Sequence, residues 1–186
     1  MRQLLPVALL FLAGCRGGND LMPLEVGKRF SYNVSTNFNS YTAEVKVIRR
    51  SAVEGLDGFV LHGPTGESFL AWKGDTLIGE RFANTRFTPA IPLVVESDKR
   101  VRRTWSGKVQ GAWGQFDGVA TLNQAPSNEI VGGRKVKVVK SELTIDNPKG
   151  KSIRLRTLFQ PGAGIVAQHQ WVGGDLVVGL DWLSGS

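Results

Sequence analysis

The sequence predicts an all-β protein, and three observations lead to this class. Apolar and polar residues alternate in short segments, and Gly, Pro, Asn and Asp separate those segments. No stretch keeps the apolar period of a long helix. The 23 glycines and 8 prolines suit many turns. We expect a single strongly curved antiparallel sheet, a half-barrel or open barrel built from meander-like hairpins, with little helix.

The alternating segments define the expected strands. They fall at about 28–36, 41–50, 57–62, 67–72, 75–82, 101–110, 113–123, 134–146, 151–160, 164–172 and 175–183. A sheet of this many strands is wider than one that side chains alone can fill, so we expect an apolar opening inside the curve.

Turn residues set the register of two hairpins. Asn147-Pro148-Lys149-Gly150 suits a type I turn followed by a bulge, which would align Ile145 with Ile153 and Glu142 with Arg156. In the last hairpin Gly173-Gly174 forms the loop. A regular ladder would then place His169, Trp171, Leu180 and Trp182 on a buried face, with Gln168, Gln170 and Asp181 outside. The hairpin around Lys73-Gly74-Asp75 fits two registers, and the sequence leaves both open.

The first fifteen residues predict export and lipidation. Arg2 precedes an apolar run from Leu4 to Ala13, which would rise only about 15 Å as a helix and is too short to span a bilayer. The run ends in Leu12-Ala13-Gly14-Cys15, which closely resembles the lipobox of bacterial lipoproteins. The resemblance implies cleavage between Gly14 and Cys15, a diacylglycerol on the cysteine sulfur and a fatty-acyl group on its new amine. Cys15 is the sole cysteine, so no disulfide is expected.

Length and charge then describe the mature chain. We expect a signal peptide at 1–14, a lipidated N-terminus with a short linker at 15–23, and one all-β domain at 24–186. Removing residues 1–14 takes away Arg2 alone among the charged residues, so the formal charge of +7 becomes +6. Basic residues cluster at 49–50, 99–103, 134–140 and 149–156. They suit either a solvated face or attraction to anionic headgroups. An exported, lipidated protein is not expected to meet nucleic acid.

Three motifs extend the resemblance along the chain. The segment from Pro23 to Tyr32 resembles the opening "PL-x-VG-x-x-W-x-Y" of many bacterial lipoproteins and secreted β-proteins, with Phe30 in the tryptophan position. Pro89 to Trp105 is similar to their Pro/Leu-rich stretch that ends in tryptophan. Phe159 to Val166 resembles their "aromatic-x-PGVG-x-V" motif before the final hairpin. The resemblance implies a curved antiparallel sheet and no particular activity.

Residues able to carry chemistry are few. We interpret His169 as a core histidine, and we place His62 in a turn where Glu67 could join it in a weak metal site. No catalytic, cofactor-binding or metal motif is present. The five tryptophans, at 72, 105, 113, 171 and 182, suit the core or a ligand groove. We therefore expect a non-enzymatic envelope module that binds an apolar ligand or an envelope protein. The alternative is an envelope hydrolase with its active site on strand loops.

Overall fold

The computed structural model describes residues 20–185 except 113 and 149, and these form twelve strands and no helix. The strands are β1 Arg29–Ser35, β2 Ser40–Val53, β3 Leu56–Gly63, β4 Gly66–Lys73, β5 Thr76–Phe82, β6 Thr85–Val95, β7 Val101–Gly111, β8 Gly114–Val131, β9 Arg134–Asp146, β10 Ile153–Gln160, β11 Gly164–Val172 and β12 Asp175–Gly185.

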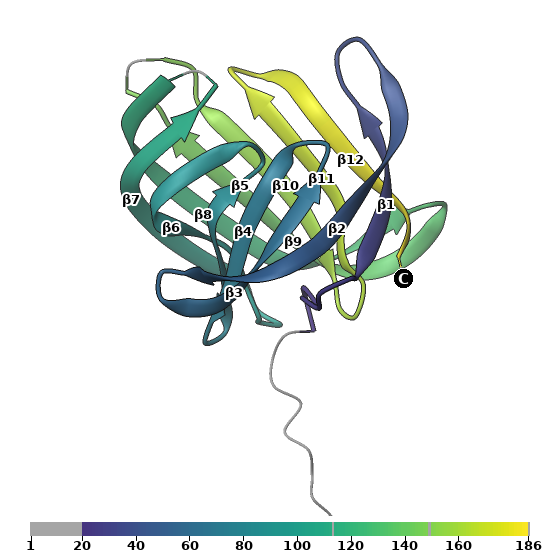
Figure 1. Ribbon diagram of the computed structural model, residues 1–186. Coiled ribbons are helices and arrows are strands. Elements are labelled where there is room, and N and C mark those ends of the chain that lie inside the picture. The colour runs from purple at the N-terminus through teal and green to yellow at the C-terminus, as the bar shows by residue number, and fades with distance from the viewer. Residues whose placement is uncertain (1–19, 113, 149, 186) are drawn as a thin grey trace, which may run out of the picture.

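The sheet is a closed antiparallel barrel, so the expected half-barrel or open barrel is wrong (Figure 1). Each strand pairs with its neighbours in the chain, and β1 closes the ring by pairing with β2 on one edge and β12 on the other. Strand twist and tilt bring the two ends of a wide sheet together, and closure leaves neither end strand with a free edge. The all-β class and the antiparallel meander are as predicted.

The interior is filled rather than open. Buried side chains from all parts of the ring form one continuous cluster, which includes Phe30, Phe87 and Phe159 at 1% exposure or less. A pocket between Met22 and Tyr32 holds about 30 Å³, room for one or two water molecules. Tyr32 donates a hydrogen bond to the carbonyl of Ile165 (2.8 Å), and burial raises the pKa of its hydroxyl well above the ordinary value.

Strand β6, which the sequence analysis did not predict, explains how a barrel of twelve strands is filled. It pairs with β7 only from Arg86 to Thr88 and then passes inside, against β8 and β9. There the side-chain amide of Gln124 bonds both backbone groups of Val95, and the Ser141 hydroxyl donates to the carbonyl of Leu93 (2.6 Å). Pro89 and Pro92 have no N–H to offer a neighbouring strand, so they suit a strand that leaves the regular ladder.

Two hairpins curl over the outside of the barrel. The end of β2–β3 covers Ala71, Ile78 and Ala90, and the Glu54 carboxylate accepts a hydrogen bond from the Ala90 N–H (2.5 Å). The ends of β8 and β9, residues 125–138, extend beyond their pairing with β7 and β10. We call this extension the β8–β9 arm. Glu129 of the arm lies 3.7 Å from Lys140 and from Arg156, so the arm folds back on the outer face.

Turn chemistry predicted one hairpin fully and the other in part. The β9–β10 pairing aligns Ile145 with Ile153 and Glu142 with Arg156, as expected, and the Gly150 N–H bonds the Asn147 carbonyl (3.2 Å). In β11–β12 the loop is as expected, with Val172 opposite Asp175. Beyond it the register shifts between Gln170 and Trp171, and a second shift lies between β10 and β11.

The β10–β11 shift leaves Val166 of β11 unpaired, and the β11–β12 shift leaves Val177 of β12 unpaired, so from Gln168 onward the faces of β11 are the reverse of those predicted. Gln168 and Gln170 point into the barrel at 3% exposure each, so their predicted outward orientation is wrong. His169 and Trp171 lie on the outer face instead. In β12 the prediction held in part: Val178, Leu180 and Trp182 contact the core and Asp181 is exposed, but Leu176, expected on the same face, stands opposite the outward-facing Trp171 and does not join the core. A bulge adds one residue to one strand, and each added residue moves the following side chains to the opposite face.

Candidate functional site

The segment from Asp20 to Pro23 closes one end of the barrel (Figure 1). Leu21 and Met22 are buried at 4% and 1% exposure and belong to the main core. The carbonyl of Asp20 accepts a hydrogen bond from the Gly162 N–H (2.7 Å), and the carbonyl of Met22 accepts one from the Trp72 indole (3.3 Å). Residues placed in the linker by the sequence analysis are thus fastened to the body of the barrel.

Two of the sequence motifs meet at this end. Gly162 and Gly164 of the Phe159–Val166 motif have φ values of +77° and +90°, which favour glycine. A Cβ on Gly164 would lie 3.1 Å from the Met22 sulfur and 3.5 Å from the Phe30 ring. The bend between β10 and β11 therefore leaves room for the incoming chain. The ends of the third motif also touch, since the Trp105 indole donates to the Pro89 carbonyl (3.2 Å).

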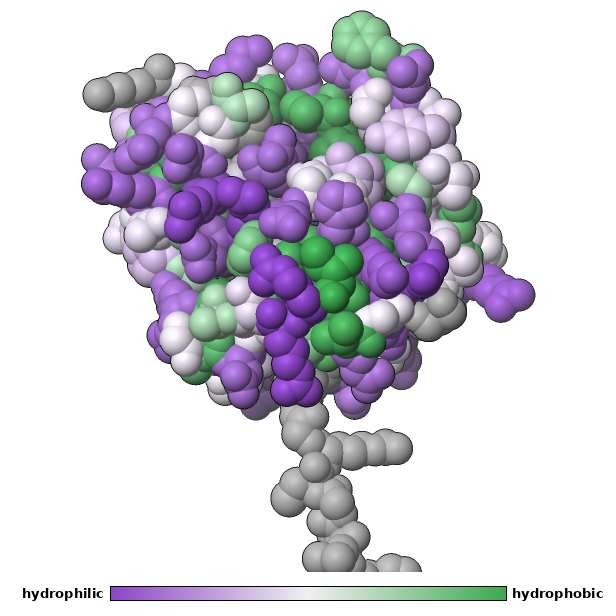
Figure 2. Space-filling view, in the orientation of Figure 1, coloured by the Kyte–Doolittle hydropathy of each residue, from purple (hydrophilic) through white to green (hydrophobic). Residues whose placement is uncertain are grey.

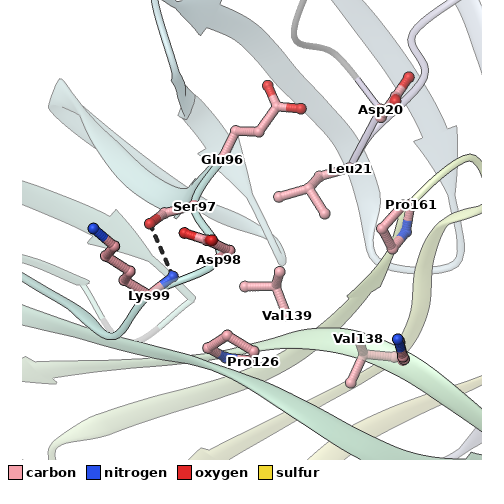
Figure 3. A pocket seen from close by; sticks show the side chains of 11 residues that line it. Asp20, Leu21, Glu96, Ser97, Asp98, Lys99, Pro126, Val138, Val139 and Pro161 are labelled. Atoms are coloured by element: carbon pink, nitrogen blue, oxygen red, sulfur yellow. Dashed lines mark hydrogen bonds between the residues drawn. The ribbon is translucent and has the colours of Figure 1, made fainter.

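An open pocket of about 650 Å³ lies beside the closing segment, and we call it the end pocket (Figure 3). Four parts of the molecule build it: the closing segment, the β6–β7 loop, the β8–β9 arm with the adjoining part of β9, and the β10–β11 turn. Its lining comprises Asp20, Leu21, Glu96, Ser97, Asp98, Lys99, Pro126, Lys137, Val138, Val139 and Pro161.

The end pocket combines an apolar floor with a charged rim. Leu21 and Val139 point toward its centre in Figure 3, and both are buried at 8% exposure or less. The rim carries three carboxylates and two ammonium groups, on Asp20, Glu96, Asp98, Lys99 and Lys137. Within residues 20–185, apart from the two gaps, no ion pair involves any of these five groups. The Ser97 hydroxyl accepts a hydrogen bond from the Lys99 N–H (3.1 Å).

A second depression has a volume of about 390 Å³, and part of its lining follows directly in sequence from Lys99 of the end pocket. It is bordered by Arg100 and Arg102 of the loop and β7, and by Lys140 and Glu142 of β9. Lys99 lines the end pocket, and the next basic residues, Arg100 and Arg102, border the second depression. Basic side chains of one short segment therefore lie beside both depressions. Polar residues cover most of the face shown in Figure 2, where apolar side chains reach the surface in limited patches.

The residues predicted to carry chemistry do not converge on the end pocket. His62 lies in β3 rather than in a turn, and it stands opposite Glu67 in the β3–β4 register. His169 lies outside, with its ring 5.8 Å from that of Trp171 and its Nε2 3.7 Å from Asp181, so the core interpretation is wrong. The described part of the chain brings no three His, Cys, Asp or Glu residues together in a group that could hold a metal ion.

The tryptophans divide between core and surface. Trp105 lies in the main core, Trp72 and Trp182 pack against it, and Trp171 stacks with Arg154 on the outer face (4.3 Å). Trp113 lies outside the described residues, as do Gly14 and Cys15 of the predicted lipidation site. No described tryptophan lines the end pocket.

Sequence reasoning missed the end pocket because its walls are far apart in the chain. Glu96 and Asp98 had the pattern of solvated turn residues, and residues 15–23 had that of a linker. One signal was present: Leu21-Met22 is an apolar pair inside a polar, Gly-rich stretch. Such a pair next to a strand is suited to burial.

Comparisons with known proteins gave matches among solved structures alone. No protein-family model matches the chain, and no curated protein matches it in sequence. Among solved structures, one assigned as a lipoprotein of Parabacteroides distasonis matches with a TM-score of 0.49 and 10% identity over 89% of this chain and 98% of that one. A protein assigned as exported, with a YmcC-like fold, from Bacteroides fragilis matches with a TM-score of 0.49 and 11% identity over 89% and 98%.

The hypothetical lipoprotein YmcC of Escherichia coli matches with a TM-score of 0.45 and 12% identity over 89% of this chain and 90% of that one. Similarity at this level transfers no property to the present chain. In the part of the chain that the structure describes, no helix has the length and apolarity needed to cross a membrane.

Proposed function

We propose that this protein is a bacterial envelope lipoprotein, anchored through lipid on Cys15, that works as a non-enzymatic binding module with the end pocket turned toward the membrane. The observation that carries the proposal is the sequence Leu12-Ala13-Gly14-Cys15 at the close of a short apolar run. A thiol is the sulfur nucleophile that lipidation needs, and two or more acyl chains hold a protein stably on a bilayer.

The orientation follows from where the folded body begins. Asp20 is five positions after Cys15 in the sequence, and five extended steps of the chain span at most about 18 Å. Asp20 itself lines the end pocket, and its carbonyl is bonded to Gly162. A lipid on Cys15 would therefore hold this end of the barrel next to the headgroups. The formal charge of +6 on the mature chain favours an anionic membrane surface, at about 1 kcal/mol per basic residue close to it.

The composition of the end pocket supports binding more than catalysis. An apolar floor and unpaired charges on the rim suit recognition of an amphiphilic ligand. A serine-type hydrolase would need a hydroxyl nucleophile with an adjacent base. Ser97 is the hydroxyl in the lining, and both histidines lie elsewhere.

The test of anchoring is metabolic labelling of cells with a clickable fatty acid, followed by membrane fractionation. The unsubstituted chain should be labelled and should sediment with membranes. Cys15→Ser should lose both the label and the attachment. As a matched control, Ser184→Cys added to Cys15→Ser restores a thiol at an exposed position of β12 and should stay unlabelled. A Cys15→Ser chain that is still labelled and membrane-bound would refute the proposal.

A further inference from the structure

The rim of the end pocket carries unpaired charges of both signs around one apolar floor. Lys99 and Lys137 can each donate to an anionic group, and the carboxylates of Asp20, Glu96 and Asp98 can accept from a cationic one. Asp20, Asp98, Lys99 and Lys137 are exposed and Glu96 is half-buried, so water solvates these charges when no ligand is bound, and a simple anion or cation would pair with only part of the rim. The ligand that satisfies the whole lining has a negative group, a positive group and an apolar part.

We propose that the end pocket binds a zwitterionic phospholipid with a primary-amine headgroup. The phosphate would lie against Lys99 and Lys137, the amine against the carboxylates, and the first carbons of the acyl chains over Leu21 and Val139. This proposal rests on the proposed function, because membrane anchoring through Cys15 is what brings phospholipid to the pocket.

The lining also distinguishes between kinds of amine. A primary ammonium group donates up to three hydrogen bonds, which carboxylates accept. A quaternary amine donates none and is characteristically bound by aromatic faces. Among the described residues, none of the eleven that line the end pocket is aromatic. The pocket chemistry therefore selects the primary amine over its trimethylated counterpart.

Size and position agree with a headgroup site. The volume of about 650 Å³ lies within the range of roughly 300–1,000 Å³ for small-ligand pockets. Because the pocket is open, the acyl chains can continue outward into a bilayer while the headgroup is held. Tethering next to the membrane raises the effective concentration of lipid, so a weak intrinsic affinity is sufficient.

The experiment measures binding of short-chain lipids by the full chain carrying Cys15→Ser, which removes the anchor and leaves residues 20–185 unchanged. Isothermal titration with dihexanoyl phosphatidylethanolamine, phosphatidylglycerol and phosphatidylcholine, each below its micelle concentration, compares a primary amine, no amine and a quaternary amine. We expect phosphatidylethanolamine to bind at least about tenfold more tightly than the other two, a difference of about 1.4 kcal/mol.

Two double variants test the two halves of the site. Lys99→Gln with Lys137→Gln, and Asp20→Asn with Glu96→Gln, should each weaken phosphatidylethanolamine binding about tenfold. The matched control is Lys151→Gln with Asp175→Asn, an exposed pair (3.4 Å) at the opposite end of the barrel, and it should change affinity less than twofold. Thermal unfolding of every variant confirms that it is folded.

Three results would overturn the proposal. Phosphatidylglycerol binding as tightly as phosphatidylethanolamine, with the carboxylate variant unaffected, would define an anion site. Equal binding of phosphatidylcholine would remove the role of the primary amine. Absence of binding by a cooperatively folded chain would exclude phospholipid altogether. None of these results bears on anchoring, which the fatty-acid labelling of Cys15 measures separately.

Discussion

Gln124 offers the most direct test of the unusual path of β6. Its side-chain oxygen accepts from the Val95 N–H (2.8 Å), its side-chain nitrogen donates to the Val95 carbonyl (2.5 Å), and the residue is 4% exposed. In a regular sheet these two backbone groups would bond to β7. Gln124→Leu keeps the volume and removes both bonds. Each buried group left without a partner costs about 1–3 kcal/mol, so for the two groups we expect a loss of about 2–6 kcal/mol.

The assay is urea denaturation followed by tryptophan fluorescence, with the free energy of unfolding taken from the midpoint and slope. The control is Asn123→Leu, one residue away on the exposed face of β8, which should change the free energy by under about 0.5 kcal/mol. Equal midpoints for the two variants would show that Gln124 does not support β6.

A second substitution at Gln124 should make the stability of the protein depend on pH. In Gln124→Glu, the protonated carboxyl can both accept from Val95 N–H and donate to its carbonyl, whereas the ionised form cannot donate. Burial raises the folded-state pKa of the introduced carboxyl above its unfolded value of about 4.3. Stability relative to the unsubstituted chain should therefore be full below about pH 4 and should fall as the pH rises through the folded-state pKa. A difference that does not vary with pH would contradict this geometry.

Two further predictions concern buried residues, Met22 and Gln170, that the sequence analysis had placed in the linker and on the outer face. Met22→Ala should lower the free energy of unfolding by about 2–5 kcal/mol, because Met22 is 1% exposed in the main core, whereas Val26→Ala, at a position 56% exposed, should cost under about 0.5 kcal/mol in the same urea experiment. Similar costs would mean that the closing segment is not part of the core. Gln170→Leu should stabilise the protein by about 1 kcal/mol, since the Gln170 side-chain nitrogen is buried without a hydrogen-bond partner, and a lower melting temperature would count against that placement.

Local chemistry accounts for the parts of the fold that could be predicted. The turn at Asn147–Gly150 lies between two strands that pair directly, so its residues alone determine that Ile145 faces Ile153. The loop Gly173-Gly174 likewise set Val172 against Asp175. The predicted faces of β11 were wrong because the bulges depend on how β10 and β12 pack against this strand. The alternation of apolar and polar residues along one strand does not depend on that packing and cannot reveal it.

The end pocket was beyond sequence reasoning for a different reason. Asp20, Glu96, Lys137 and Pro161 come from segments that are dozens of residues apart, and each by itself has the pattern of a turn, a linker or a solvated face. Only the folded chain brings their side chains around one apolar floor. The apolar character of Leu21-Met22 was the one local indication that this end of the barrel is structured.

By itself the sequence determined the all-β class and the antiparallel meander, and it predicted lipidation at Cys15, because alternation, turn residues and a cleavage motif are all read from neighbouring positions. The tertiary structure decided that the sheet closes, that β6 passes inside and that the interior is solid. Closure depends on pairing between β1 and β12, which are more than a hundred residues apart, and on the accumulated twist of the strands between them. The inward path of β6 depends on Gln124 and Ser141 of other strands, which take the place of the hydrogen bonds that β7 would have provided.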